Sequence, residues 1–358
     1  MTRTPTRRIL AASTVFVATA LVVSGCSSAG SSDAGASDTI VVSTFPFGVE
    51  QFQEAVIDPF TAKTGIKVEV ETGSNADRLS QLQLAAGDPG IDVMLISDTF
   101  AASGQEKNLF QSFDDSNVPN LATIADFATE EGFDGPAYSY QLNGTLYNTD
   151  EVTAAQAADW SLYADPALSG RLAFPDISVT AGQLAVSGVA DAFGSGPYDV
   201  DSAYKTLGEW APGILQFYSS STEVTNLLTQ GEIVAADALS GFATTLIASG
   251  EPVAWTAPAK GRYMATNRAM IPEGAPNVEG AYAFIDYLLS AEAQSASAKI
   301  VGDLPVAPDA EIPEAITSVV GDIAADPVAA GYSTLDPAQI LPNRAQWVER
   351  FAREVSSR

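Results

Sequence analysis

The sequence contains no histidine and only one cysteine, Cys26, among its 358 residues. Without histidine, the chain lacks the general base of Ser-His and Cys-His catalysis, and it lacks the commonest metal ligand. A single cysteine cannot form an intramolecular disulfide or a zinc-type cysteine cluster. We therefore expect no disulfide, no resident metal and no cofactor.

Positive charge is also scarce. The chain has 17 Lys and Arg residues against 44 Asp and Glu residues, which gives a formal net charge of −27. This excess of negative charge repels nucleic acid and anionic lipid headgroups, so we expect no nucleic-acid partner. The hydrophobic fraction of 46% and the charged fraction of 17% are typical of a packed globular protein.

The N-terminal segment has the pattern of an export signal. Three arginines precede the uncharged apolar run Ile9–Val23, which is shorter than a typical membrane span. The run ends in Val23-Ser24-Gly25-Cys26, which resembles the lipobox of bacterial lipoproteins. That resemblance implies cleavage before Cys26 and acylation of its thiol, which would hold the protein on the outer side of the cytoplasmic membrane. The alternative is an ordinary signal peptide followed by an unrelated cysteine.

The segment after Cys26 changes character at Thr39. Residues 27–38 contain only Gly, Ala, Ser and Asp, which indicates a flexible tether. From Thr39 onward, three strand patterns alternate with helical patterns, as in a parallel sheet built from βαβ units. The predicted strands of this region are Thr39–Ser43, Lys67–Glu71 and Asp92–Ile96.

A second α/β region begins near Arg171. Its predicted strands are Ile214–Tyr218, Ile233–Ala236 and Val253–Trp255. The segments 137–148 and 263–271 read as extended chain, so we interpret them as the crossovers between two lobes. The last third is rich in proline and ends in a predicted amphipathic helix near 345–355.

Several segments, in order along the chain, carry a family resemblance. They are Asp58-Pro59-Phe60 with Thr64–Val68, Gly90–Met94, Leu146–Asp150, Ser169–Leu172, and Ile271–Asn277 followed by Ala281–Ile285 and Ser290–Ala293. Together they resemble extracellular solute-binding proteins of ABC importers, in the subgroup of polyamine, thiamine and ferric-iron receptors. The last group of segments is the most specific match.

This resemblance implies an α/β, two-lobed periplasmic-binding-protein fold of type II-like architecture, with a ligand cleft between the lobes. Solute binding would shift a hinge equilibrium toward a closed form, which would then dock on the permease subunits in the membrane. We expect a monomer and no enzymatic activity. The expected division is a signal peptide at 1–25, a tether at 26–38, an N-terminal lobe at 39–140 plus 268–310, a C-terminal lobe at 141–267, and a helical extension at 311–358 that packs on the lobes.

Candidate ligand contacts follow from a general rule for open α/β sheets. Ligands of such sheets lie beyond the carboxyl ends of the strands, at topological switch points. Applied to the predicted strands and crossovers, the rule selects Thr44, Phe45, Phe47, Ser74, Asn75, Ser97, Asp98, Thr99, Tyr138, Tyr140, Thr180, Gln183, Ser219, Asp237, Ser240, Tyr263 and Asn267.

The chemistry of the solute stays open at this point. Aromatic rings beside carboxylates suit a polyamine, the leading candidate, or the thiamine cation. However, polyamine receptors normally carry a tryptophan in the stretch matching Ala238–Gly241 and an acid where Asn267 stands. Iron receptors of the subgroup usually use a Tyr-Tyr pair, which this chain lacks.

Two further alternatives remain. A phosphonate or phosphate ester could be held by helix N-termini and by Arg78, Arg262 or Arg268. An exported hydrolase is the alternative from a different class, although the chain has no Gly-x-Ser-x-Gly motif.

Overall fold

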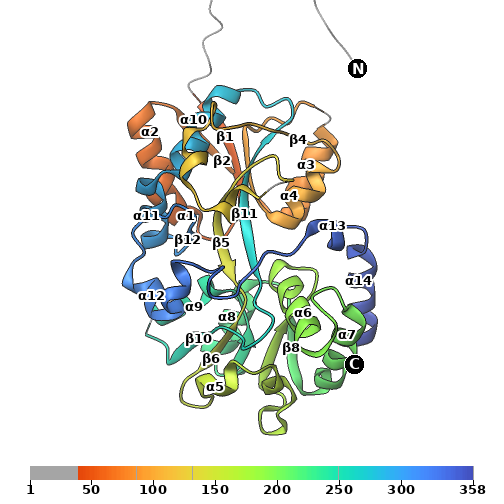
Figure 1. Cartoon of the computed structure of the whole chain (residues 1–358). Helices are drawn as coiled ribbons and strands as arrows, with labels where there is room; N and C mark the ends of the chain where they lie inside the picture. The colour runs from red at the N-terminus through yellow and green to blue at the C-terminus, as the bar shows by residue number, and fades with distance from the viewer. Residues whose placement is uncertain (1–38, 86, 131, 249, 358) are drawn as a thin grey trace, which may run out of the picture. The chain divides into compact units, whose positions relative to one another are not determined.

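The computed structural model describes residues 39–357 apart from 86, 131 and 249. The predicted signal peptide, Cys26 and the tether therefore lie outside the described residues. Within the described part, the chain forms two lobes, and each lobe is built around one β-sheet (Figure 1).

The sheet of the first lobe has the strand order β12-β5-β11-β3-β1-β2, with β4 paired to β11. Its strands are β1 (Thr39–Thr44), β2 (Lys67–Thr72), β3 (Val93–Ser97), β4 (Phe110–Gln111), β5 (Ala137–Leu142), β11 (Met264–Pro272) and β12 (Leu304–Pro305). β1 runs parallel to β2 and β3, whereas β11 runs antiparallel to β3 and β5. The three predicted N-terminal strands thus form a parallel core that a strand from much later in the chain extends.

The sheet of the second lobe has the order β10-β6-β9-β7-β8. Its strands are β6 (Thr145–Asn148), β7 (Leu172–Pro175), β8 (Ile214–Tyr218), β9 (Ala235–Asp237) and β10 (Val253–Thr256). β7 is parallel to β8 and β9, and β6 is antiparallel to β9 and β10. In each sheet, three parallel strands therefore lie at one side, and a strand of the crossovers, β11 or β6, pairs with them in antiparallel orientation.

Helices cover the sheets of both lobes (Figure 1). Those of the first lobe are α1 (Val49–Phe52), α2 (Asp58–Thr64), α3 (Asn75–Ala85), α4 (Asp98–Gln105), α10 (Val278–Leu289) and α11 (Ala291–Ile300), with short 3₁₀ turns at Pro119–Thr123 and Asp126–Thr129. Those of the second lobe are α5 (Ala154–Ala157), α6 (Thr180–Phe193), α7 (Val200–Trp210), α8 (Ser221–Thr229) and α9 (Ser240–Ala248), with 3₁₀ turns at Trp160–Ala164, Pro166–Leu168 and Ala211–Gly213. The C-terminal segment holds α12 (Glu314–Val320), α13 (Pro337–Ile340) and α14 (Arg344–Phe351), with a 3₁₀ turn at Gly321–Ala324 and a terminal π-turn at Ala352–Ser356.

Pro59 shows how the sequence sets the local structure. The predicted helix from Val49 meets a proline that cannot donate a backbone hydrogen bond. The helix that begins at Val49 therefore changes to one turn of π-helix at Gln53–Ile57, and α2 then begins with Pro59 in its first turn. Gly65 ends α2 in the left-handed conformation that glycine adopts without steric cost.

A buried carboxylate holds three elements of the first lobe together. Asp92 Oδ2 accepts a 2.7 Å hydrogen bond from the backbone N–H of Val41 in β1, and its Oδ1 accepts one of 2.6 Å from the N–H of Asn277. The side chain of Asn277 in turn caps α10 by accepting from the Gly280 N–H. The segments Gly90–Met94 and Ile271–Asn277, two parts of the family resemblance, therefore meet through this one residue.

The two crossovers pass side by side between the sheets. β5 leads directly into β6 through Asn143 and Gly144, and residues 257–263 lead from β10 into β11. β5 ends at Leu142 and β11 begins at Met264, so the expected lobe boundaries after Tyr140 and after Asn267 lie inside these two strands.

Asn143 ties the crossovers together. It is fully buried, its side-chain Oδ1 accepts from the Tyr263 N–H at 2.9 Å, and its Nδ2 donates to the Gly261 carbonyl at 3.1 Å. The hydroxyl of Tyr332 also donates to the Asn143 carbonyl. The connection between the lobes is thus a hydrogen-bonded unit rather than two independent linkers.

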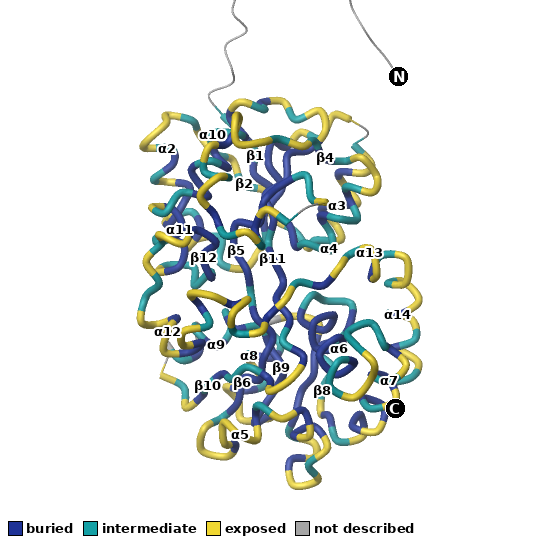
Figure 2. Tube along the Cα trace, viewed as in Figure 1, coloured by how far each residue is buried: buried dark blue, intermediate teal, exposed yellow. Residues whose placement is uncertain are grey.

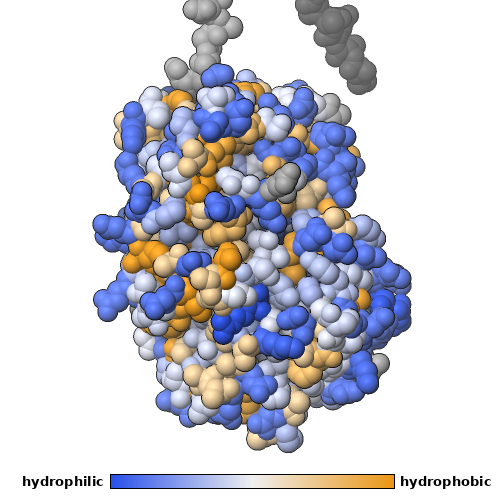
Figure 3. All heavy atoms as spheres, viewed as in Figure 1, coloured by the Kyte–Doolittle hydropathy of each residue, from blue (hydrophilic) through white to orange (hydrophobic). Residues whose placement is uncertain are grey.

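The burial pattern follows the sheets. The strands of both lobes are mostly buried, whereas the outer turns of the helices and the loops are exposed (Figure 2). Polar residues cover much of the face in Figure 3, and a group of hydrophobic residues lies over the region of α12. In the C-terminal segment, Trp347, Phe351 and Val355 belong to the buried core of the second lobe.

Candidate functional site

A cavity of about 290 Å³ is lined by residues from both lobes. The first lobe contributes residues from the ends of β1 and β3, from β5 and β11, and from the turns at 45–49 and 301–303. The second lobe contributes the start of α6, the end of β8 and the start of α9. The cavity therefore lies where the strand-end rule places ligands in open α/β sheets.

The predicted site residues divide into two groups. Those that line the cavity are Thr44, Phe45, Phe47, Asn75, Ser97, Tyr138, Thr180, Ser219 and Asn267. Those that the structure places elsewhere are Ser74, Asp98, Thr99, Tyr140, Gln183, Asp237, Ser240 and Tyr263. Ligand contact by the first group stays a prediction. The residues of the second group make contacts within the protein.

Aromatic rings from both lobes face the cavity. Phe47 of the first lobe meets Phe242 of the second edge to face, with ring centroids 6.3 Å apart. Phe47 is 57% exposed, so much of its ring is available to a solute. Tyr138 and Tyr218 also line the cavity, and burial is the main cause that raises the pKa of both phenols. Both phenols therefore stay neutral, and the Tyr218 hydroxyl donates its hydrogen bond to the Asp237 carbonyl.

Neutral polar groups form another part of the wall. Asn75 Nδ2, at the start of α3, donates to Ser97 Oγ at 2.9 Å, and Asn75 Oδ1 accepts from Arg78 at 3.1 Å. The Arg78 guanidinium also donates to the backbone carbonyls of Gly73, Ser43 and Leu95. Burial lowers the pKa of Arg78 to about 10, so it stays charged, but its donors are directed at protein acceptors.

Asp303 contributes a carboxylate that the sequence rule does not select. It lines the cavity between Gly302 and β12, and Ser297 Oγ donates to its Oδ2 at 2.8 Å. Burial raises the pKa of Asp303 to about 6, while the hydrogen bond from Ser297 opposes that shift. At neutral pH, Asp303 is therefore mostly ionised, and it is the only charged residue among the described residues that line the cavity.

The chain direction explains why Asp303 reaches this edge. β12 runs antiparallel to β5, so its beginning lies at the edge of the sheet where the parallel strands end. The strand-end rule considers only residues that follow a strand, and a two-residue strand leaves no hydrophobic period to detect. The available sequence signal was the Gly302-Asp303 pair directly after a helix, a pattern that is equally common in simple turns.

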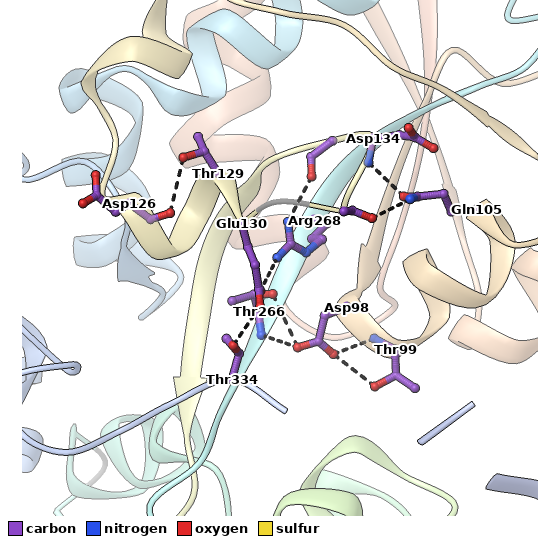
Figure 4. Close-up of polar contacts among 12 residues, drawn as sticks. Asp98, Thr99, Gln105, Asp126, Thr129, Glu130, Asp134, Thr266, Arg268 and Thr334 are labelled. Carbon is purple, nitrogen blue, oxygen red and sulfur yellow. Dashed lines mark hydrogen bonds and ion pairs between the residues drawn. The ribbon is translucent and has the colours of Figure 1, made fainter. Parts of the chain in front are cut away.

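Asp98 lies in a polar network at one side of β11 instead of on the cavity wall (Figure 4). Its Oδ2 accepts from the Thr266 N–H at 3.0 Å, and its Oδ1 accepts from the Thr99 N–H at 2.6 Å. Burial is the main cause that raises the pKa of Asp98, and the backbone hydrogen bonds and the charge of Arg268 oppose it. The Asp98 carboxylate thus accepts hydrogen bonds from Thr99 and from the backbone of β11.

The same figure shows where Arg268 is directed. Its guanidinium forms an ion pair with Glu130 at 3.1 Å, donates to the Gly135 carbonyl and lies 3.4 Å from the centroid of the Phe133 ring. Glu130 also accepts from Thr334 Oγ1 of the C-terminal segment. Arg268, a candidate for anion binding in the sequence, is therefore used within the protein.

Ser74 and Tyr140 are also engaged within the protein. Ser74 Oγ accepts from the Asp77 N–H at 3.1 Å and donates to the Asp77 carboxylate at 2.7 Å, as in a cap of α3. The Tyr140 hydroxyl donates to the Ala324 carbonyl at 2.8 Å and is buried. Both residues support the fold around the cavity.

Ser240, Gln183 and Tyr263 are buried and do not line the cavity. Ser240 Oγ donates to Gln141 Oε1 at 3.3 Å. Gln183 is buried on α6, and Tyr263 belongs to the crossover unit around Asn143. Gln141 of β5 lines the cavity, so Ser240 of the second lobe helps to position a wall residue of the first lobe.

Asp237 is almost completely buried at the end of β9. Neither carboxylate oxygen has a hydrogen-bond partner among the described residues, and burial raises the pKa of Asp237 well above its ordinary value. Its backbone carbonyl accepts from the Tyr218 hydroxyl. Burial therefore disfavours the ionised form of this side chain, which does not line the cavity, whereas Tyr218 does.

Among the described residues, no group of three or more His, Cys, Asp or Glu side chains has an arrangement that could hold a metal ion. Within the same residues, no helix combines the length and hydrophobicity needed to cross a bilayer.

The fold and the cavity define the class: a two-lobed α/β binding protein that holds a small ligand between its lobes. A family model described as bacterial extracellular solute-binding protein matches residues 55–325. The chain belongs to this family, and the predicted family and fold class are thereby confirmed.

Individual relatives agree with this assignment. The chain is 25% identical over 247 residues to spermidine/putrescine-binding periplasmic protein 1 of Haemophilus influenzae, covering 67% of this chain and 68% of the relative. It is 24% identical over 311 residues to iron uptake protein A1 of Synechocystis, covering 80% and 82%. The crystal structure of an ABC transporter from Clostridium perfringens superposes with a TM-score of 0.74 at 28% identity, over 88% of this chain and 99% of that one.

Proposed function

We propose that this protein is the solute receptor of an ABC importer and that its solute is a small organic cation carrying an ammonium group. The closed receptor would deliver this solute to a membrane permease. The names of several relatives include spermidine or putrescine, which are cations of this class. Polyamines, the leading candidates from the sequence, are therefore the first compounds to test.

The observation that carries the proposal is the charge of the cavity. Asp303 is the only formally charged residue among the described residues of its wall, and aromatic rings supply much of the remaining surface. A carboxylate offers charge-assisted hydrogen bonds to an ammonium group, and aromatic faces attract a cation. The large negative charge of the chain also favours the approach of cations over anions.

The alternative solutes fit this wall less well. A phosphonate needs cationic donors, but Arg78 and Arg268 direct their guanidinium groups at protein acceptors, and neither of them nor Arg262 lines the cavity. Ferric iron needs several anionic oxygen ligands, and the wall offers one carboxylate. The thiamine cation stays compatible with the aromatic surface.

A thermal-shift panel tests the proposal. The panel contains spermidine, putrescine, butylamine, thiamine, ferric citrate, aminoethylphosphonate and sugars, and the protein begins at residue 27. A ligand at one hundred times its dissociation constant adds about 2.7 kcal/mol of apparent stability, a shift of several degrees. We expect stabilisation by an organic cation. Stabilisation only by an anion or a sugar, or turnover of any of these compounds, would contradict the proposal.

We also propose that Cys26 carries the lipid that holds the receptor on the membrane. The lipobox resemblance at Val23–Cys26 supports this assignment. The substitution Cys26→Ser is expected to move the protein from the membrane fraction to the soluble fraction and to leave the melting temperature of the folded part unchanged. Cell fractionation measures the effect, and continued retention in the membrane fraction would refute the lipid assignment.

A further inference from the structure

We infer that the solute of this receptor presents a single ammonium group, which Asp303 binds, and that the rest of the solute is uncharged. The inference rests on the proposed function and narrows it from organic cations in general to monoamines. It separates this chain from its diamine- and polyamine-binding relatives by the chemistry of the cavity.

The carboxylate of Asp303 is held in place by a hydrogen bond and can bind one cation. Ser297 Oγ, itself buried, holds Oδ2 at 2.8 Å, and no ion pair joins Asp303 to a lysine or arginine of the described residues. An ionised carboxylate has acceptor capacity well beyond one hydrogen bond. A partly buried charge without a protein counterion is costly unless a ligand supplies the opposite charge. Asp303 can therefore accept further hydrogen bonds, and a bound cation would offset the free-energy cost of its partly buried charge.

The remaining polar groups of the wall cannot neutralise a second cation. Asn267 is neutral, and its Nδ2 donates to Ser139 Oγ at 3.1 Å. Gln141 is neutral as well, and its Oε1 already accepts from the Gly241 N–H at 2.8 Å. Nearby acids do not change this balance, because neither lines the cavity: the Asp98 carboxylate accepts from the backbone of β11, and Asp237 is buried.

A second ammonium group would thus lose its hydration at a wall of neutral amides and hydroxyls. Burial of an unpaired charge is expensive, whereas burial of a methyl group at the same place is favourable. The apolar part of the wall, which includes Phe47, Leu239 and Phe242, suits an uncharged tail. The wall as a whole matches a solute with one charged end and one apolar or weakly polar body.

The test compares two ligands of equal carbon-chain length, butylamine and putrescine, by calorimetric titration of the folded protein that begins at residue 27. The wild-type protein is expected to bind butylamine at least about tenfold more tightly, because one unpaired ammonium group typically costs more than this factor. The variant Asn267→Asp adds a second carboxylate to the wall and is expected to raise the affinity for putrescine relative to butylamine by about tenfold or more. Asn267→Gln, which keeps the amide, is the matched control and should leave the preference of the wild type.

The outcomes separate the two proposals. Equal or tighter binding of putrescine by the wild type, with both ligands weakened by Asp303→Asn, would overturn the single-ammonium inference and leave the cation receptor standing. Failure of both amines to bind, together with stabilisation by an anion or sugar in the thermal-shift panel, would overturn the proposed function itself. If Asn267→Asp folds with the wild-type melting temperature but keeps the wild-type preference, the neutral wall does not set the specificity, and the inference is wrong.

Discussion

Replacement of Asp303 by asparagine is expected to weaken the binding of an amine solute by about 30-fold or more while leaving the protein folded. The substitution removes the only charge on the described wall of the cavity and keeps the size of the side chain. Loss of one partner from a desolvated charge pair costs roughly 2–5 kcal/mol, which corresponds to a factor of about 30 to several thousand in affinity. Calorimetric titration with the best amine from the panel measures the change.

Two controls make this result specific. Asp115→Asn removes the same charge from an exposed loop, so it reports any effect of the overall negative field, and its affinity should match the wild type within a factor of about two. Ser297→Ala keeps the carboxylate and removes one hydrogen bond to it, so a loss of about tenfold, smaller than that of Asp303→Asn, is expected. An affinity of Asp303→Asn equal to that of Asp115→Asn would exclude Asp303 from the site.

The second large effect is expected at the crossover between the lobes. Gly261 has a φ of +73°, and a Cβ at this position would lie 2.4 Å from the carbonyl oxygen of Gly188 on α6. Its own carbonyl accepts from Asn143 Nδ2, so the backbone cannot move without loss of that bond. Gly261→Ala should therefore combine left-handed backbone strain of about 1–2 kcal/mol with an overpacking cost of about 1–3 kcal/mol. The melting temperature should fall by several degrees or more.

Gly170 provides a matched control for backbone strain. Its φ of +75° is nearly the same, but a Cβ there would meet no atom within 4 Å. Gly170→Ala should therefore cost only the strain term, about 1–2 kcal/mol. Equal melting temperatures for the two variants would show that the contact between Gly261 and Gly188 does not constrain the crossover.

The fold was predictable from local patterns to a considerable extent. The three N-terminal strands appear as β1, β2 and β3 within about one residue of the expected bounds, since runs of β-branched residues next to turns are a clear strand pattern. The predicted C-terminal helix near 345–355 corresponds to α14 and the π-turn after it. The lobe boundaries were harder to predict from the sequence. β5 and β11 are continuous strands, and the sheet to which each residue of a crossover belongs depends on strand pairing in the tertiary structure.

The candidate site was predictable only in part. The strand-end rule selected residues such as Asn75, Ser97 and Thr180 that do line the cavity, because parallel strands end at a common edge. It could not distinguish a side chain that faces the cavity from one that serves the backbone, as at Asp98. It also could not find Asp303, which precedes an antiparallel strand.

The central claim is that the ionised carboxylate of Asp303 binds a cationic solute, and the pH dependence of affinity tests it most directly. Burial raises the pKa of this carboxyl to about 6, so protonation competes with cation binding below that pH. An alkylamine stays protonated in this range, because its pKa is near the value of about 10.4 for lysine. Tyr138 and Tyr218, which also line the cavity, have raised pKa values and do not titrate there.

The measurement is a calorimetric titration of wild-type protein and Asp303→Asn with butylamine at about pH 7.5 and at about pH 5. The wild type should lose about tenfold in affinity between the two, because about one molecule in ten keeps the carboxyl ionised one unit below its pKa. The variant should bind weakly and equally at both values. A wild-type affinity that does not change with pH, or the same change in both proteins, would contradict the assignment of Asp303 as the residue that binds the cation.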